Sequence, residues 1–273
     1  MREWIAALPM YNVTSTLRGH WRTLIDDTLG LLREDGFADP VVQLDTADLS
    51  LDTLWRRDDL LVSQTCGYPL MRTLPSSIQV VGTPVFDVPG CDGPNYSSVL
   101  VVSDAAYAAG ATTIERCRGL RAALNDPLSN SGMNVFRHAV APFATEGRFF
   151  SAAIETGSHV GSLKAIIEGT ADVAAIDCVT FAYAQEIAEI ARAPLHVIGY
   201  TMQTPGLPLI ASASVAPDVV AKLRDALGRA LNADPARACA LRLHGFASLT
   251  RSDYTVLIDL ESEAIAKGYP KLA

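Results

Sequence analysis

Segment 125–134 (Asn-Asp-Pro-Leu-Ser-Asn-Ser-Gly-Met-Asn) carries the side chains best suited to binding a small anion. It follows an apolar run typical of a buried strand and precedes apolar residues at helical spacing, which predicts a strand, a polar turn and a helix start. Backbone N–H groups at a helix start attract an oxyanion. Ser129, Asn130 and Ser131 would add side-chain donors, and Gly132 would let a ligand approach the backbone. The alternative is that a serine of this turn only caps the helix, and the sequence leaves it open.

Two further strand ends carry polar side chains. A predicted strand over 149–155 leads into the polar turn 156–159, and His159 stands just before a short amphipathic helix. The apolar strand 171–177 then ends in a carboxylate, Asp177. Ligands of open α/β sheets bind beyond the carboxyl ends of the strands. The sequence therefore predicts one binding site built from three strand ends.

These motifs resemble the substrate-binding proteins of ABC transporters for phosphonate, phosphite and phosphate. The resemblance rests on 126–132, 157–159 and 169–177, and the surrounding architecture extends it to most of the chain. It implies the type II periplasmic binding-protein fold, which is α/β and two-lobed, with mixed sheets, helices on both faces and a ligand cleft between the lobes. It also implies a solute-binding protein that closes on a small oxyanion ligand, a phosphonate or related phosphorus oxyanion, and serves an ABC permease.

The resemblance also assigns roles to single residues. The family's phosphoryl-binding hydroxyls correspond to Ser129 and Ser131, its site histidine to His159 and its site carboxylate to Asp177. The family often has Thr between the two serines, where this chain has Asn130. A carboxylate repels a fully charged anion, so Asp177 is expected to accept a proton from a protonated oxygen or an amine of the ligand. Capping of the following helix is the equal alternative for Asp177.

Five more candidates precede or follow strands of the first lobe. Tyr11 follows the first predicted strand, and Thr65, Cys66 and Tyr68 follow the third, so all four are expected at the edge that faces the ligand. A tyrosine there can stack on a ligand and donate its hydroxyl. For Tyr11, covering the end of the core is an equal alternative. Tyr96 lies just before the strand that crosses between lobes, where the family also has a site tyrosine.

The alternation of strands and helices predicts the domain organisation. Residues 1–100 and 200–273 are expected to form lobe 1, and residues 104–196 an inserted lobe 2. Hinge crossings are expected near 99–103 and 197–206, and two such connections allow a cleft to close. Repeated βαβ units in the first lobe predict a parallel sheet. The carboxyl-terminal section is predicted to be helical.

Composition narrows the classes of function. The 273 residues are 49% hydrophobic and 19% charged, which suits well-formed cores and argues against disorder. A net charge of −8 argues against nucleic acid as a partner. No apolar stretch is long enough to span a bilayer, so contact with a membrane would be peripheral at most. Five cysteines without metal-ligand spacing and five scattered histidines indicate neither a metal site nor a cofactor.

Two alternative functions remain at this stage. Residues 1–8 show no apolar signal segment, so the localisation stays open: periplasmic by resemblance, or cytoplasmic if no signal was ever present. The second case would make the protein a cytoplasmic ligand sensor or accessory protein. The other alternative is an enzyme on the same scaffold, with Cys66 as a nucleophile or His159 as a base. The sequence places no base near Cys66 and shows no paired carboxylates, so we expect a protein that is not an enzyme.

Overall fold

The computed structural model describes residues 2–45 and 50–273, which form two compact α/β units. Unit 1 consists of Met1–Asp87, Asp92–Pro94 and Pro205–Asp253, and unit 2 of Val88–Cys91, Asn95–Thr204 and Tyr254–Ala273. The division differs from the expected one at its carboxyl-terminal end. Residues 254–273, which the sequence analysis assigned to lobe 1, belong to unit 2. The expected hinge crossing 99–103 and the first part of the expected crossing 197–206 lie in neighbouring strands of the unit 2 sheet, Ser98–Ser103 and Leu195–Tyr200.

Unit 1 contains a six-stranded mixed sheet in the order β14-β4-β13-β3-β1-β2. Its strands are β1 (Trp4–Ala7), β2 (Val41–Gln43), β3 (Leu60–Gln64), β4 (Gln79–Phe86), β13 (Leu209–Ala211) and β14 (Leu243–Ala247). Strand β1 runs parallel to β2 and β3, as the βαβ units predicted, whereas β13 is antiparallel to both β3 and β4. Strand β14, antiparallel to β4, lies in the section that was predicted to be helical.

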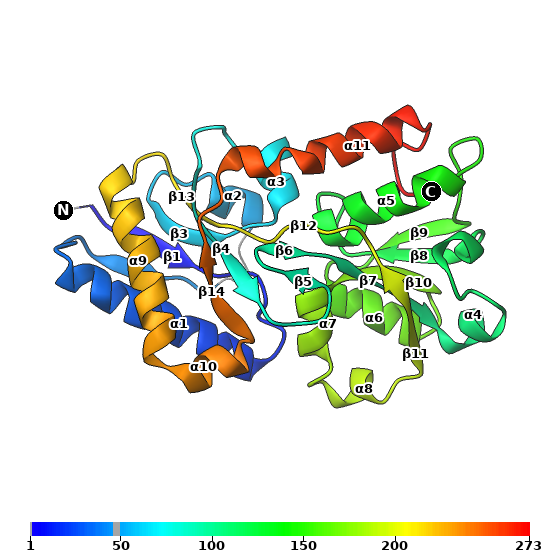
Figure 1. Cartoon of the computed structure of the whole chain (residues 1–273), viewed down its shortest axis with the longest axis horizontal. Helices are drawn as coiled ribbons and strands as arrows, with labels where there is room; N and C mark the ends of the chain where they lie inside the picture. The colour runs from blue at the N-terminus through cyan, green and yellow to red at the C-terminus, as the bar shows by residue number, and fades with distance from the viewer. Residues whose placement is uncertain (1, 46–49) are drawn as a thin grey trace. The chain divides into compact units, whose positions relative to one another are not determined.

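Within the described residues, unit 1 contains five α-helices besides this sheet. They are α1 (Ser15–Glu34), α2 (Leu51–Trp55), α3 (Gly67–Arg72), α9 (Pro217–Ala233) and α10 (Pro235–Ala240). Helices α1 and α9 lie side by side over the sheet (Figure 1). Their apolar faces, with Ile25 of α1 and Leu223 of α9, pack into one core with Leu61 of β3. Burying each such side chain contributes about 1.5–3 kcal/mol, so this core fixes the strands from which the unit 1 candidates emerge.

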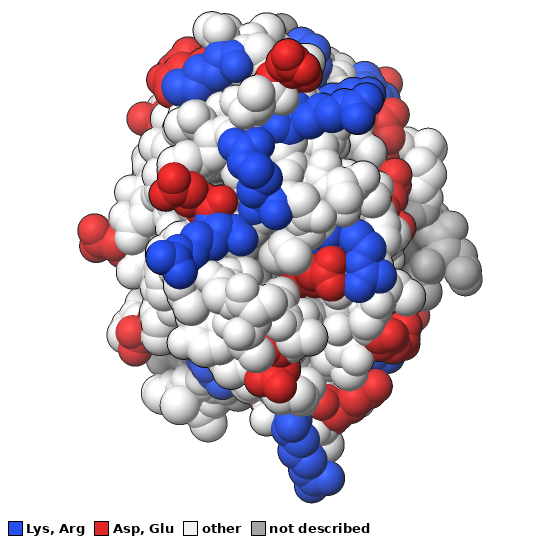
Figure 2. Space-filling view, turned by 90° about the vertical axis from the view of Figure 1, so that its right-hand side faces the viewer, with Lys and Arg blue, Asp and Glu red and all other residues white. Residues whose placement is uncertain are grey.

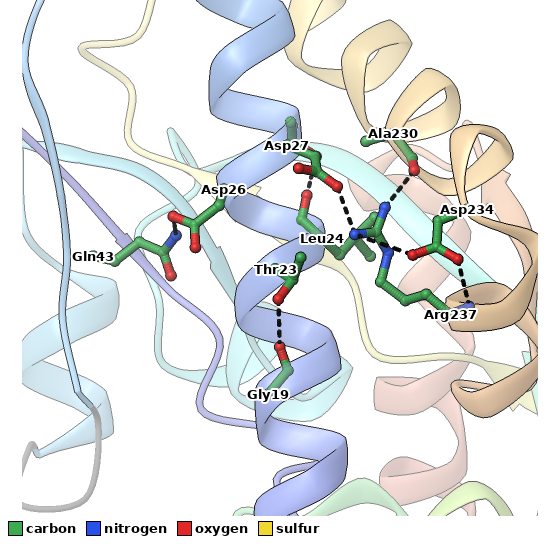
Figure 3. Close-up of polar contacts among 10 residues, drawn as sticks. Gly19, Thr23, Leu24, Asp26, Asp27, Gln43, Ala230, Asp234 and Arg237 are labelled. Atoms are coloured by element: carbon green, nitrogen blue, oxygen red, sulfur yellow. Dashed lines mark hydrogen bonds and ion pairs between the residues drawn. The ribbon is translucent and has the colours of Figure 1, made fainter.

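A buried arginine joins α1 to α9 and α10. The Arg237 guanidinium donates to the Asp27 carboxylate at 2.5 Å and to the Ala230 carbonyl at 2.6 Å (Figure 3). Asp234 lies 4.0 Å away and also caps α10 by accepting from the Arg237 backbone N–H. A buried cation needs such partners, because an unpaired charge in a core is strongly destabilising. The pairing therefore fixes the approach of α10 to α1.

Unit 2 contains a five-stranded mixed sheet in the order β11-β7-β10-β8-β9. Its strands are β7 (Ser98–Ser103), β8 (Arg121–Leu124), β9 (Ala152–Glu155), β10 (Val173–Asp177) and β11 (Leu195–Tyr200). Strand β8 is parallel to both β9 and β10, and β7 is antiparallel to β10 and β11. Three short strands pair separately: β5 (Cys91–Asp92), β6 (Asn95–Tyr96) and β12 (Thr204–Pro205).

Helices cover both faces of the unit 2 sheet, as predicted. They are α4 (Asp104–Ala108), α5 (Val135–Val140), α6 (His159–Ile167), α7 (Cys178–Ala184), α8 (Ala188–Ala191) and α11 (Val256–Ala266). Figure 1 shows α6 and α7 on one side of the strands and α5 on the other, where it packs against α11. Among the residues that the structure describes, no helix combines the length and apolar character needed to cross a membrane.

The carboxyl-terminal segment belongs to unit 2 because specific hydrogen bonds hold it there. The Asn134 amide donates to the Leu257 carbonyl of α11 at 2.9 Å. The backbone N–H groups of Phe149 and Phe150 both donate to the carbonyl of Ala273, at 2.8 and 3.0 Å. The apolar periodicity of 254–266 indicated a helix but carried no information about which unit it covers. This is why its assignment to lobe 1 was wrong.

Candidate functional site

Three parallel strand ends lie side by side in unit 2. Strand β8 is flanked by β10 and β9, so the segments that follow these strands leave the same edge of the sheet. Ser129 follows β8, His159 follows β9, and Asp177 is the last residue of β10. The adjacency of these strand ends, which the sequence predicted, is therefore present in the fold.

The serine-rich turn begins with π-helical geometry. Residues Asn130–Asn134 form one π-turn that continues into α5. Ser129 caps it: its Oγ accepts from the Gly132 N–H at 3.0 Å, and its carbonyl accepts from the Asn134 N–H at 3.0 Å. Single π-turns occur often at functional sites, because they widen a helix and turn its side chains to new directions. The capping role that was open for Ser129 is thus observed.

Ser131 forms the centre of a polar cluster. Its Oγ lies 2.8 Å from Nε2 of His159 and 3.5 Å from Oγ of Ser129. Its carbonyl accepts from the Ser98 hydroxyl of β7 at 2.9 Å. The Ser131 side chain is only 3% exposed, so its hydroxyl is held in place by the protein and not by bulk water. Two hydroxyls and an imidazole from two different strand ends therefore converge, as the sequence analysis expected of these three residues.

Burial keeps His159 neutral. Desolvation lowers its pKa from 6.5 to about 4, because the charged form loses its hydration inside the protein. The ring atom Nδ1 is buried and has no hydrogen-bond partner among the described residues. With its proton on Nε2, the neutral ring donates to Ser131 Oγ, and the Ser131 hydroxyl proton can then be donated to a ligand. In this tautomer both side chains are neutral donors.

Lowering the pH is expected to destabilise the protein through His159. The unfolded side chain takes up a proton near pH 6.5, whereas folded His159 stays neutral down to about pH 4. Its contribution to stability is complete above pH 6.5 and is lost as the pH falls through that window, by about 2 kcal/mol between pH 7 and pH 5. Denaturant titrations of the wild type and of His159→Gln should show this difference. An identical pH dependence for the two proteins would contradict it.

The side chain of Asn125 leaves no room for a Cβ at position 132, so this position needs glycine. A Cβ at this position would lie 1.8 Å from Oδ1 of Asn125 and 3.2 Å from Cε1 of His159. Gly132 was predicted to let a ligand approach the backbone, but the side chain of Asn125 lies against it. Oδ1 of Asn125 is itself buried without a hydrogen-bond partner in the described part of the chain. Asn125 was not among the predicted candidates, although it directly follows β8, where the strand-end rule places candidate residues.

Asn130 links the serine turn to Tyr96. Its amide nitrogen donates to the Tyr96 hydroxyl at 3.1 Å and to the Thr204 hydroxyl at 2.9 Å. Its Oδ1 accepts from the Asn134 amide at 3.1 Å. A threonine at this position could not make these three bonds with its single hydroxyl. Asn130 therefore orients Tyr96 toward the same turn as the two serines.

Asp177 serves as a helix cap. Its Oδ1 accepts from the backbone N–H groups of Val179 and Thr180, at 2.8 and 2.9 Å, at the start of α7. Its backbone pairs with that of Ser98, the residue whose hydroxyl bonds to the Ser131 carbonyl. Of the two roles left open for Asp177, capping is observed. Contact with a ligand stays a prediction.

Tyr11, a candidate of unit 1, lies in an aromatic cluster. Its ring stacks on Trp21 with centroids 6.4 Å apart and meets Phe86 edge-on at 5.2 Å. Its backbone has a φ of 62°, an uncommon conformation for a residue other than glycine. Rare conformations of this kind concentrate at functional sites and turns. The ring packing supports the core-covering role, while a ligand contact through Tyr11 stays a prediction.

The other unit 1 candidates surround the start of α3. Thr65 follows β3 directly, Cys66 takes the N-cap position of α3, and Tyr68 lies in its first turn. All three are buried, and the Thr65 hydroxyl donates to the Cys66 carbonyl at 3.2 Å. Cys66, which was expected after the third strand, thus lies at an enclosed helix start. These residues and Tyr11 follow β3 and β1, two neighbouring parallel strands.

The candidate site is characterised by neutral hydrogen-bond donors, the Ser129 and Ser131 hydroxyls and the His159 ring, and not by a concentration of charge. On the face drawn in Figure 2, Lys and Arg are mixed with Asp and Glu among many uncharged residues. Within the described residues, no group of three or more His, Cys, Asp or Glu side chains could hold a metal ion.

Unit 1 contains a small hollow of about 50 Å³. It is lined by Arg18, Trp21 and Gln43 among others, and none of the candidate residues lines it. Since about 10–15 Å³ suffices for one water, the hollow has room for a few water molecules.

Two α/β units, with neutral donors gathered at the carboxyl ends of parallel strands, define a solute-binding protein with the type II periplasmic binding-protein fold. The family model described as ABC transporter, phosphonate, periplasmic substrate-binding protein matches residues 59–254. The chain belongs to this family. Transport of a small solute with a membrane permease is the activity that the family defines, and it is favoured over the sensor and enzyme alternatives.

Solved structures share the fold at low sequence identity. A binding protein component of an ABC phosphonate transporter from Pseudomonas aeruginosa is 17% identical, with a TM-score of 0.73 over 97% of this chain and 87% of that one. PhnD1 from Prochlorococcus marinus, in complex with methylphosphonate, is 14% identical, with a TM-score of 0.73 over 97% and 98% of the chains. The aliphatic sulphonate binding protein SsuA from Escherichia coli is 13% identical, with a TM-score of 0.61 over 97% and 86%. No curated protein matches the chain.

Proposed function

We propose that the protein binds a phosphonate, or a closely related small phosphorus oxyanion, and delivers it to the permease of an ABC importer. The observation that carries the proposal is the cluster of Ser129, Ser131 and His159 at adjacent strand ends. Family membership supports the transport role. The methylphosphonate complex of the Prochlorococcus protein supports the choice of ligand class.

The chemistry of the cluster suits a tetrahedral oxyanion. The oxygens of a phosphonate accept several hydrogen bonds from directions that diverge by about a tetrahedral angle, and hydroxyl donors on a turn can follow that geometry. Hydrogen bonds to a charged oxygen are roughly twice as strong as those between neutral groups. The sequence places no Lys or Arg in 125–132 or 156–159, so the proposed site uses neutral donors throughout.

A neutral site next to a carboxylate also selects the protonation state of the ligand. Asp177 ends the strand beside β8, and its negative charge disfavours a dianion nearby. A monoanion that keeps one proton, or a ligand with an amine, can instead donate a hydrogen bond to that carboxylate. We therefore propose that the protein prefers a singly charged phosphonate. Tyr11, Thr65, Cys66 and Tyr68 of unit 1 stay predicted ligand contacts.

Binding without turnover is part of the proposal. Cys66 is buried at a helix N-cap position, and His159 bonds to Ser131, a residue proposed to hold the ligand. An enzyme would need a nucleophile and a base directed at the same reacting atom. The proposed role of His159 is instead to hold a hydroxyl in place.

A calorimetric screen is expected to show binding of at least one phosphorus oxyanion. The screen contains phosphate, phosphite, methylphosphonate and 2-aminoethylphosphonate, with sulfate and an alkyl sulphonate as tetrahedral controls that carry no proton near neutral pH. Each is titrated at pH 6 and pH 8. Affinity should fall at the higher pH, where the ligand loses its last proton. Absence of heat from all phosphorus ligands would refute the ligand class, and binding of a sulphonate alone would reassign it.

A further inference from the structure

Two cysteines of unit 2 lie in direct contact. Cys91 belongs to the short strand β5, and Cys178 is the first residue of α7. Their Sγ atoms are 3.5 Å apart, and the thiols share a hydrogen bond. The two residues are 87 positions apart in the sequence, and neither lies in a motif that would have paired them.

The backbone on both sides of this pair is fixed. A Cβ built on Gly90 would lie 3.0 Å from Cβ of Cys178, so the chain before Cys91 lies close against the start of α7. Gly90 holds a φ of 101°, and its carbonyl accepts from both the N–H and the hydroxyl of Ser97, each at 2.9 Å. Ser97 in turn accepts from the Cys178 N–H at 3.2 Å. Ser97 thus bridges the two segments that carry the thiols.

We propose that Cys91 and Cys178 are a redox pair that closes into an intrachain disulfide when the protein meets an external disulfide. The thiolate of Cys91 attacks the external disulfide, forms a mixed disulfide and releases one thiol. The thiolate of Cys178 then attacks the Cys91 sulfur, and the second thiol leaves. The protein loses two electrons and two protons, which reduce one external disulfide to two thiols.

The surroundings set the order of these two steps. Cys178 is only 1% exposed, whereas Cys91 is partly accessible, so an external reagent reaches Cys91 first. The hydrogen bond with Cys91, together with burial, raises the pKa of the Cys178 thiol. Once Cys91 is in a mixed disulfide, it no longer provides a thiol partner, and Cys178 becomes easier to ionise. Burial of the second thiol also protects the closed pair from reductants.

Closure would tie the strand segment at Cys91 to the helix that Asp177 caps. The family is described as periplasmic, and disulfides persist in that compartment. A cross-link that encloses many residues restricts the unfolded chain, so oxidation is expected to raise the melting temperature by about 5–10 °C. The effect does not require a bound ligand, so it can be measured whether or not the proposed ligand class is correct.

Tryptic mapping tests the proposal directly, because every cysteine falls in a different tryptic peptide. The peptides are 58–72 with Cys66, 73–116 with Cys91, 117–118 with Cys117, 165–192 with Cys178 and 238–242 with Cys239. The folded protein is equilibrated with oxidised glutathione, alkylated and digested. The expected product joins 73–116 to 165–192 and is lost with dithiothreitol. Separate alkylation of both peptides would overturn the proposal.

Three variants complete the test. Cys178→Ala should trap glutathione on Cys91, and Cys91→Ser should leave Cys178 unmodified. Both should abolish the rise in melting temperature on oxidation. Cys239→Ser, which removes the exposed cysteine, should behave as the wild type. A cross-link that includes Cys239, or glutathione on Cys178 in the Cys91→Ser protein, would contradict the proposed pairing or its order.

Discussion

Replacing Ser129 and Ser131 together with alanine is expected to weaken ligand affinity about a hundredfold or more. Both hydroxyls lie in the cluster that is proposed to hold the oxyanion, 3.5 Å from each other. A hydrogen bond to a charged group contributes about 1.5–3 kcal/mol, and each 1.4 kcal/mol is a tenfold change in the dissociation constant. The measurement is calorimetry with the best ligand of the screen, at the pH where the wild type binds most tightly.

The single variants separate binding from folding. Ser129 caps the π-turn, so Ser129→Ala should also lower the free energy of unfolding by about 1 kcal/mol. Ser131→Ala leaves that cap intact and should act mainly on affinity. Ser262→Ala, on the exposed face of α11, is the matched control and should change neither quantity. Normal affinity in the double variant, together with a lower melting temperature, would reduce both serines to structural caps.

The strand ends could be predicted because a simple rule connects sequence to position. Polar residues that follow apolar strands must lie at the carboxyl edge of a parallel sheet, and β10, β8 and β9 are neighbours there. Ser131 and His159 are 28 residues apart in the chain, yet this rule brings their side chains within 2.8 Å. The same rule applied to Asn125 would have added it to the candidates.

Other features could not be predicted, because they depend on the identity of a distant partner. The apolar stripe of α11 indicates a helix, but only its contact with α5 assigns it to unit 2. Gly132 looked like a ligand contact, since the sequence does not show that Asn125 occupies the space above it. Strand β14 contains a glycine and a histidine, so its sequence shows only a weak alternation of apolar and polar residues. It becomes a strand because it pairs with β4. The Cys91–Cys178 contact likewise comes from tertiary packing alone.

The carboxyl-terminal segment depends on a buried arginine of α5. Arg137 is 3% exposed, and its guanidinium donates to the Pro270 carbonyl at 2.9 Å and to Oδ1 of Asn134 at 2.6 Å. The carboxylate of Glu261, on α11, lies 3.9 Å from it and is also buried. One cation therefore connects α5 both to α11 and to the last residues of the chain.

Arg137→Leu is expected to lower the free energy of unfolding by about 3–5 kcal/mol. The leucine fills part of the volume but removes the bonds to Pro270 and Asn134 and the cation that lies 3.9 Å from the Glu261 carboxylate. Removing one partner of a buried ion pair has a cost of this size. Urea denaturation measures the loss, and limited proteolysis should show earlier cleavage within 254–273. The double variant Arg137→Leu/Glu261→Leu should recover part of the stability, because the anionic partner of Arg137 is then removed from the interior as well. Arg116→Leu, at an exposed position of the same unit, should stay within about 0.5 kcal/mol of the wild type. If the double variant were no more stable than Arg137→Leu, loss of the ion pair with Glu261 would not be the cause, and the lost bonds to Pro270 and Asn134 would have to account for the effect.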